Sequence, residues 1–135
     1  MNNLLFLAAK FALPRIPNDP RNYHLGCVGI RADGVLVSSQ NGAVSGCIKK
    51  HTRHSLPEVH AEVRVIKKLG KYGTIYVARV NKINNGFTMA KPCRMCETLI
   101  RSAKVNKVYY SISDSEYGIW FVKKNIHKIK MLKNV

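Results

Sequence analysis

Two short clusters of metal-ligating and acidic residues stand apart from the rest of the sequence. The first is His60-Ala61-Glu62, and the second is Pro92-Cys93-Arg94-Met95-Cys96. Cys93 and Cys96 are three residues apart, so on a helical turn their thiols share one face and can reach one ion. With His60 they make three ligands of the types that zinc prefers, which leaves the fourth tetrahedral position open. The spacing therefore predicts one catalytic zinc ion per chain, held by His60, Cys93 and Cys96.

The acidic residue beside the first ligand has a use in the same chemistry. Water at the open position of such a zinc ion becomes a nucleophile near neutral pH. A neighbouring carboxylate can accept the water proton and deliver it to a leaving group, so Glu62 is the predicted general acid and base. His60 and Glu62 lie about 200° apart around an ideal helix, and they converge only if the pocket lies over the end of that helix.

Two other interpretations of the cysteines stay open. Cys27, Cys47, His51 or His54 could complete a closed, structural zinc site. A lone Cys-x-x-Cys could also be redox-active. Neither interpretation uses Glu62, and Cys27 lies in an apolar run that is typical of a buried strand. In a reducing compartment, four cysteines favour metal binding or burial over disulfides.

The elements that must position these clusters follow from the periodicity of apolar residues. Helical spacing predicts three helices, at residues 2–12, 57–69 and 92–104. Alternating and β-branched runs predict five strands, at residues 23–32, 35–39, 74–80, 105–111 and 119–122. This alternation predicts an α/β fold, a sheet with helices on its faces. Because only Ile112–Gly118 separates the last two strands, they are expected to run antiparallel.

Size and charge narrow the class of protein. The 135 residues, of which 46% are hydrophobic, predict one domain spanning residues 1–135. Lys and Arg number 23 against 7 Asp and Glu, so the net charge is 23 − 7 = +16, which would attract polyanions. A lysine-rich bias that keeps the protein in solution is the alternative. The apolar run Leu4–Leu13 is too short to span a membrane and lacks the features of a secretion signal, which predicts a cytoplasmic protein.

The two clusters together resemble a known signature. His-x-Glu followed by Pro-Cys-x-x-Cys is typical of zinc-dependent nucleobase deaminases. From about Tyr23 to Ser111 the chain resembles the cytidine and deoxycytidylate deaminase superfamily, including its small stand-alone viral or bacterial members. The resemblance rests on the strand Gly26–Ile30, the hairpin at Asp33-Gly34, the pair Asn41-Gly42 and both zinc clusters.

The resemblance implies a three-layer α/β/α sandwich around a five-stranded mixed sheet, conversion of cytosine to uracil with release of ammonia, and assembly into a homo-oligomer. It further implies that Asn41 binds the substrate sugar and that the backbone amide of Ala61 binds the base carbonyl. Lys91, directly before the second cluster, stands where many members have Ser or Thr, and it is included among the predicted substrate contacts.

Two classes of substrate remain open. A small pocket favours a free (deoxy)cytidine nucleoside or nucleotide, with the basic loop Lys49–His54 binding its phosphate. The net charge favours single-stranded DNA or RNA, whose bases could stack on Tyr117, Tyr110 or Trp120 and whose backbone could follow a basic tail at residues 123–133. Packing in the core is the alternative role of those aromatic residues. A non-catalytic nucleic-acid-binding module is the third hypothesis, against which the intact Glu62 counts.

Overall fold

A central β-sheet carries helices on both of its faces. The computed structural model describes residues 2–12, 23–40, 42–43, 58–59, 61–81, 84 and 86–132. Its helices are α1 (Asn2–Ala12), α2 (Ala61–Leu69) and α3 (Arg94–Ser102). Its strands are β1 (Tyr23–Ile30), β2 (Leu36–Gln40), β3 (Gly42–Ala43), β4 (Glu58–Val59), β5 (Thr74–Asn81), β6 (Phe87–Thr88), β7 (Lys107–Ser111), β8 (Glu116–Phe121) and β9 (Ile126–Met131).

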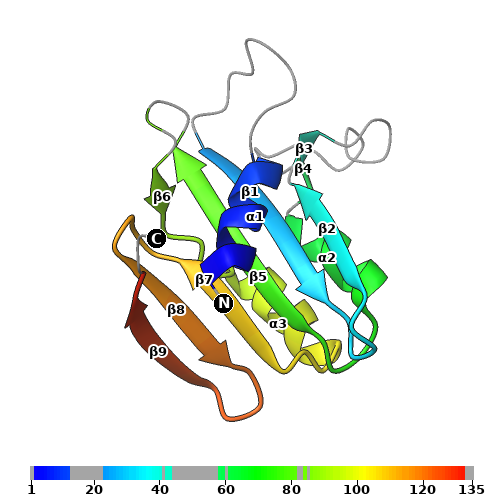
Figure 1. Ribbon diagram of the computed structural model, residues 1–135. Helices are drawn as coiled ribbons and strands as arrows, with labels where there is room; N and C mark the ends of the chain where they lie inside the picture. Colours follow the sequence, from blue (N-terminus) through cyan, green and yellow to red (C-terminus); the bar gives the residue numbers. More distant parts are fainter. Residues whose placement is uncertain are drawn as a thin grey trace.

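The main sheet is mixed, as the sequence predicts. Six of its seven strands follow the order β2-β1-β5-β7-β8-β9, and the seventh, β6, pairs with the part of β5 that β7 leaves uncovered (Figure 1). Among the strand pairs that the structure describes, only β5 and β7 run parallel, with α3 in the connection between them. β7 and β8 are antiparallel. This confirms the direction expected from their short connection.

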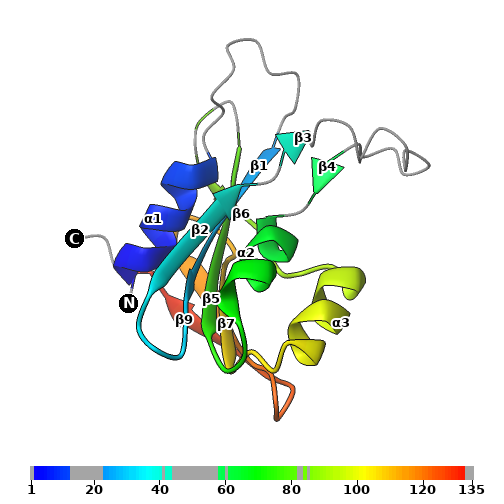
Figure 2. The same cartoon turned by 90° about the vertical axis from the view of Figure 1, so that its right-hand side faces the viewer.

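The helices form two outer layers. Turning the molecule by 90° shows α1 on one side of the sheet and α2 with α3 on the other (Figure 2). Each side has its own core. Leu5, Ala8 and Val28 are buried between α1 and the sheet, whereas Val65, Ile100 and Trp120 are buried between the sheet and the pair α2 and α3. The predicted three-layer sandwich is therefore confirmed. Among the described helices, none is long and apolar enough to cross a membrane.

The sheet has more strands than the five expected, because β6 and β9 join it. The prediction of a basic tail at residues 123–133 is wrong for most of these residues, because Ile126–Met131 forms strand β9, which pairs with β8. Asn125 allows the tight reversal, because it has a positive φ of 54° that asparagine tolerates. Its side-chain oxygen also accepts hydrogen bonds from Trp120 Nε1 (3.0 Å) and Arg101 (2.9 Å). These contacts dock the hairpin against α3.

Close packing of α1 on β1 depends on a glycine. A Cβ atom at Gly26 would collide with the carbonyl oxygen of Ala8 and would lie 2.6 Å from the backbone nitrogen of Ala12. Both obstacles are helix backbone, which cannot turn aside as a side chain can. The absence of a side chain at Gly26 therefore sets how near α1 lies to the sheet.

We expect Gly26→Ala to lower the free energy of unfolding by about 3 kcal/mol, because overpacking here must displace a helix. Gly34→Ala is the control: it has a φ of 92° but open space around the new methyl group, so strain alone should cost about 1 kcal/mol. Urea unfolding of both variants checks the difference. Equal losses would show that α1 is not held at this distance.

Candidate active site

The second cluster lies at the start of α3. Cys93 is the N-cap residue, with extended backbone angles (φ −72°, ψ 169°), and its side chain makes no capping hydrogen bond to the helix. Its carbonyl accepts the first helical bond, from the amide of Glu97 (2.8 Å). Cys93 is exposed, whereas Cys96, one turn later, has 0% of its surface exposed. The two sulfur-bearing residues thus sit where the helix N-terminus favours negative charge.

The first cluster lies at the start of α2. The sequence predicts that this helix begins at Pro57, but it begins at Ala61, because Glu58–Val59 forms strand β4 and pairs with β3. Pro57 and His60 lie outside the described residues, and of Ala61 and Glu62 only the backbone is described. Both of these belong to the first turn of α2, whose backbone amides have no partner within the helix. This start is compatible with the expectation that the pocket lies over a helix end.

Chain direction brings the two helix starts to one end of the sheet. α3 begins after the carboxyl end of β5 and ends before the start of β7, which runs parallel to β5. α2 ends just before β5 begins, so it runs back along β5 and its first turn lies at the same end. α2 and α3 pack against each other on one face (Figure 2). Such an end, where helix N-termini meet strand carboxyl ends, is the usual ligand site of α/β sheets.

The small sheet of β3 and β4 joins the sequence neighbours of two predicted site residues, Asn41 and His60. Asn41 and His60 are outside the described residues, but their neighbours are paired: Gly42, which follows Asn41, lies opposite Val59, which precedes His60. This antiparallel pairing brings together the residues adjacent to the two predicted positions.

A buried serine fixes the segment that leads into Cys93. Ser111, at the carboxyl end of β7, has 0% of its surface exposed. Its hydroxyl donates to the carbonyl of Thr88 (2.7 Å) and accepts from the amide of Arg79 (3.1 Å), while its carbonyl accepts from the amide of Ala90 (2.9 Å). These bonds attach the chain before Cys93 to the ends of β5 and β7. The sequence alone does not identify Ser111 as a site residue, because its only signal is that it is polar at the end of an apolar strand.

Ser111→Ala should lower the free energy of unfolding by about 1–3 kcal/mol, since it leaves a buried carbonyl and amide without their hydroxyl partner. Because the segment leads to Cys93, zinc affinity should fall as well. Ser115→Ala, on an exposed turn, is the control and should change stability by less than about 0.5 kcal/mol. Thermal unfolding and a competitive zinc titration measure the two effects, and unchanged values for Ser111→Ala would contradict the anchoring role.

Lys91 lies beside a histidine that sequence analysis did not single out. His127 of β9 stacks on Trp120 (5.6 Å between ring centroids, 1° between planes), and its Nδ1 is 3.1 Å from the hydroxyl of Tyr110. Burial lowers the pKa of His127, and the positive charge of Lys91 lowers it further. The negative charge of Glu97 raises it by less, and the positive charge of Arg101 is the last of the causes that lower it. Lys91 is therefore near β9 as well as the second cluster.

The lowered pKa of His127 predicts that the free energy of unfolding decreases as the pH is lowered. The folded protein keeps this imidazole neutral, whereas the unfolded chain takes up a proton near the ordinary value of about 6.5. The stabilisation is thus present above about pH 6.5 and is lost as the pH falls towards the lower pKa of the folded state, with a slope of at most about 1.4 kcal/mol per pH unit. His127→Phe, which retains a ring on Trp120, should remove this component. Urea unfolding across this pH range measures the free energy of unfolding of both proteins. Identical pH profiles of the original chain and His127→Phe would show that His127 is not the group responsible.

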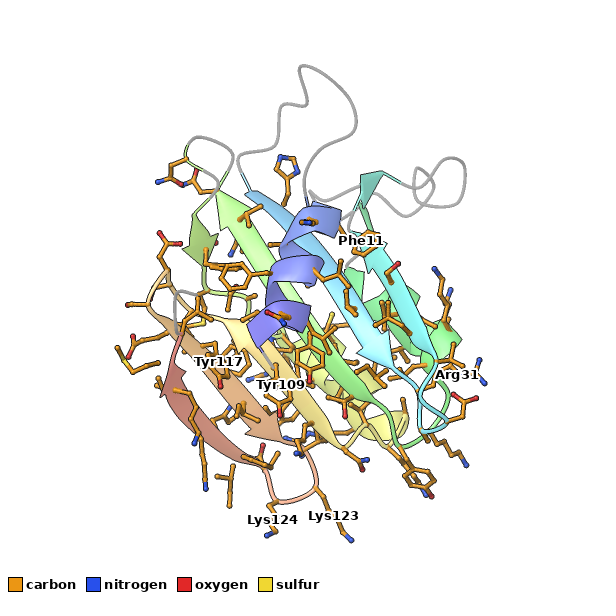
Figure 3. The ribbon with its side chains drawn as sticks, in the orientation of Figure 1. Phe11, Arg31, Tyr109, Tyr117, Lys123 and Lys124 are labelled. Carbon is orange, nitrogen blue, oxygen red and sulfur yellow. The ribbon has the colours of Figure 1, made fainter. Side chains whose placement is uncertain are left out.

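The predicted role of Tyr117 as a substrate contact does not agree with its position. Its ring is partly buried: it stacks on Tyr109 (6.3 Å between centroids) and packs against the core on the α1 side, on the opposite face of the sheet from Cys96 and Ile100. Figure 3 shows Tyr109 and Tyr117 side by side next to α1. Alternate residues of a strand point to opposite faces, and Tyr117 has the parity of Ile119 rather than that of Trp120.

The other two aromatic residues are on the side of α2 and α3, but they are core residues. Trp120 has 0% and Tyr110 has 4% of its surface exposed, so core packing, the alternative interpretation, holds for both. Cys27 is likewise fully buried, in β1. The loop Lys49–His54 and Cys47 lie outside the described residues.

The two predicted zinc ligands that the structure describes, Cys93 and Cys96, are suited to zinc. Two thiol residues one turn apart at a helix N-terminus match the ligands and the charge that a zinc site needs. Residues 2–12, 23–40 and 61–132 with their small gaps contain no group of three His, Cys, Asp or Glu side chains that could hold a metal ion. His60, the third predicted ligand, lies outside the described residues, so its assignment as a ligand rests on the sequence alone.

Comparison with known proteins assigns the family. A family model described as the cytidine and deoxycytidylate deaminase zinc-binding region matches residues 4–112. The chain belongs to the cytidine and deoxycytidylate deaminase family. No curated protein matches the sequence of this family member.

Solved structures of deaminases share the fold. Cytidine deaminase from Mycobacterium leprae aligns with a TM-score of 0.53 and 16% identity over 97% of this chain and 92% of its own. The cytidine deaminase from Mycobacterium tuberculosis aligns with a TM-score of 0.52 and 17% identity over 83% of this chain and 88% of its own. The deaminase fold expected from the resemblance is confirmed.

Proposed function

We propose that this family member is a zinc-dependent hydrolase that converts the cytosine of a free (deoxy)cytidine nucleoside or nucleotide to uracil. The observation that carries the proposal is the meeting of two helix starts, at Ala61 and Arg94, at the end of the sheet where β5 and β7 terminate. The family match supports the chemistry, and the small size of the domain supports a small substrate.

Each predicted site residue would have its own role in the reaction. His60, Cys93 and Cys96 would hold the zinc ion, which when bound supplies an activated water for attack on the amidine carbon of the base. Glu62 would accept one proton of that water and transfer it to the ring nitrogen, where the uracil product keeps it. It would then carry the second proton, from the hydroxyl group added to the base, to the amino group, which leaves as ammonia. The first-turn amide of Ala61 would donate to the base carbonyl, because no helical partner uses it.

Binding of the sugar and phosphate would involve residues around the same end of the sheet. Asn41 would hydrogen-bond the sugar, which the pairing of Gly42 with Val59 supports by joining its strand to the one before His60. Lys91, exposed directly before Pro92, would attract a substrate phosphate. We place Tyr117 outside this pocket.

The net charge of +16 favours a second candidate, deamination of bases in single-stranded DNA or RNA. One experiment separates the two. The zinc-loaded protein is incubated with cytidine, deoxycytidine, their monophosphates, and single-stranded DNA and RNA at low and moderate salt, and ammonia release and base conversion are measured. Turnover of a free nucleoside or nucleotide with little salt dependence supports the proposal, whereas conversion of oligonucleotides alone, lost as salt rises, overturns it in favour of the second candidate.

Two controls protect that experiment. Glu62→Gln gives the background from contaminating deaminases, and the same protein without substrate gives the background of ammonia. Absence of turnover on every substrate, with zinc bound, would overturn both candidates and leave a non-catalytic module. The expected homo-oligomer is tested on the same sample by sedimentation velocity.

A further inference from the structure

The face of the sheet beside α1 is only partly covered. α1 packs over β1, β5 and the edge of β7, and among the described helices none covers β8 or β9 on this side (Figures 1 and 2). Strand pairing places three residues of β8 and three of β9 towards it: Tyr117, Ile119, Phe121, Ile126, Lys128 and Lys130. The surface beyond α1 therefore combines aromatic, isoleucine and lysine side chains, with Ile119 largely buried.

Phe121 has a lysine on either side. Lys107 of β7 lies directly opposite Phe121 in the pairing, and its Nζ is 5.8 Å from the centre of the ring. Lys128 of β9 places its Nζ 5.6 Å from the same ring. Within the described part of the chain, neither ammonium group has a carboxylate at ion-pair distance. Two positive charges thus gather at one partly exposed ring.

The same arrangement continues along β8. Tyr117 is paired with Lys130 of β9, and both face the side of α1. Phe121 and Tyr117 are four residues apart, which on a strand is about 13 Å. Two aromatic residues in a row are therefore each accompanied by a lysine on a neighbouring strand.

Acidic side chains are absent from this face within the described residues. Residues 104–133 contain seven lysines and two acidic residues, Asp114 and Glu116. Glu116 has the strand parity of Trp120 and so belongs to the side of α3, and Asp114 accepts a hydrogen bond from the amide of Phe87 (2.8 Å). Lys123 and Lys124 at the tip of the β8–β9 hairpin extend the positive charge (Figure 3).

We propose that the basic aromatic face, formed by Lys107, Tyr117, Phe121, Lys128 and Lys130, binds single-stranded nucleic acid. An exposed ring can stack on an unpaired base, whereas in a duplex the base faces are already stacked on one another. The flanking ammonium groups meet the phosphates. A second copy of this chain is a poor occupant, because the like charges of the two faces would repel. The face is across the sheet from Cys96, so it is separate from the proposed pocket and does not depend on the proposed reaction.

Binding is tested with the full chain by fluorescence anisotropy. The probes are labelled single-stranded DNA and RNA, the duplex of the same sequence, and vesicles with anionic lipid. We expect single strands to bind more tightly than the duplex. Phe121→Leu keeps an apolar side chain but removes the ring, and it should weaken binding of single strands by about tenfold while leaving the duplex nearly unchanged.

The lysines are tested by charge reversal. Lys107→Glu with Lys128→Glu should weaken binding and make the slope of log affinity against log salt shallower by about 1.4, two phosphate contacts on a single strand. The matched control is Lys67→Glu with Lys71→Glu, which makes the same change of net charge at exposed positions of α2 and the turn after it. The control should keep most of the affinity and the original slope.

Several outcomes would overturn the inference. One is that the duplex binds as tightly as the single strands or more tightly. Another is that both charge-reversed double variants lose the same affinity. The third is that vesicles bind more tightly than single strands and that Phe121→Leu does not change vesicle binding. Circular dichroism and zinc content establish that each variant is folded. Failure of the proposed deaminase reaction would leave these binding results unaffected, and variants of the basic aromatic face should retain the turnover of free cytidine if that reaction occurs.

Discussion

Replacing Cys93 with alanine is expected to reduce bound zinc from about one ion per chain to a small fraction, and deaminase turnover should fall with it. A thiolate contributes both a coordinating atom and half of the charge that neutralises Zn²⁺, so two remaining ligands bind far more weakly than three. Cys93 is exposed at the start of α3. Its removal should therefore leave the core and the free energy of unfolding of the apo protein nearly unchanged.

Metal analysis of purified, dialysed protein measures the loss. Met95→Leu is the matched control, because Met95 lies between the two cysteines, is 54% exposed and has no predicted role at the metal; it should retain zinc. Cys96→Ser should also lose zinc, with an added loss of stability because Cys96 is fully buried. Zinc content that is unchanged in Cys93→Ala would remove it from the ligand set.

The sequence predicted much of this fold because most of its elements carry a local signal. Helix α1 has the predicted bounds, since its apolar residues recur at helical spacing and Pro14 closes the pattern. The antiparallel direction of β8 followed from the length of a connection, which needs no knowledge of packing. The sequence predicts a start of α2 that is too early, because Pro57 is a good first helical residue and nothing local reveals that β4 pairs with β3.

Strand parity explains the errors at the carboxyl end. The sequence indicates a strand from Ile119, but β8 begins at Glu116, and register along the whole strand decides which face Tyr117 joins. The lysines of residues 123–133 suggested a solvated tail, although an edge strand with one exposed face is compatible with them. Both assignments depend on the partner strand, which composition does not contain.

At the candidate site, the same division applies. Cys93 and Cys96 can be proposed as zinc ligands from the sequence because their spacing is local to one helical turn. Ser111 was not found, because its importance comes from bonds to Thr88, Ala90 and Arg79, which are distant in sequence. The residues proposed to carry the reaction can thus be identified from the sequence, whereas a residue that holds their segment in place is identified only from the fold.

The second large effect concerns the proton transfer itself: Glu62→Gln should bind zinc and substrate but lower kcat by about 10²–10⁴-fold, the usual contribution of a positioned acid and base. Glutamine has nearly the shape of glutamate and can donate a hydrogen bond, but it cannot accept the proton of water and pass it to a leaving group. Because Glu62 lies in the first turn of α2, the loss of its negative charge should cost at most about 1 kcal/mol of stability.

The experiment compares kcat, KM, zinc content and the free energy of unfolding with those of Glu58→Gln, the same substitution on neighbouring β4. The control should retain kcat. A Glu62→Gln protein with normal zinc and normal turnover would mean that another group moves the proton, whereas one that loses zinc would assign Glu62 to the metal rather than to the reaction. A fall in kcat with KM and zinc unchanged is the pattern that only a proton-transfer role produces, because a general loss of folding would lower active protein and zinc together.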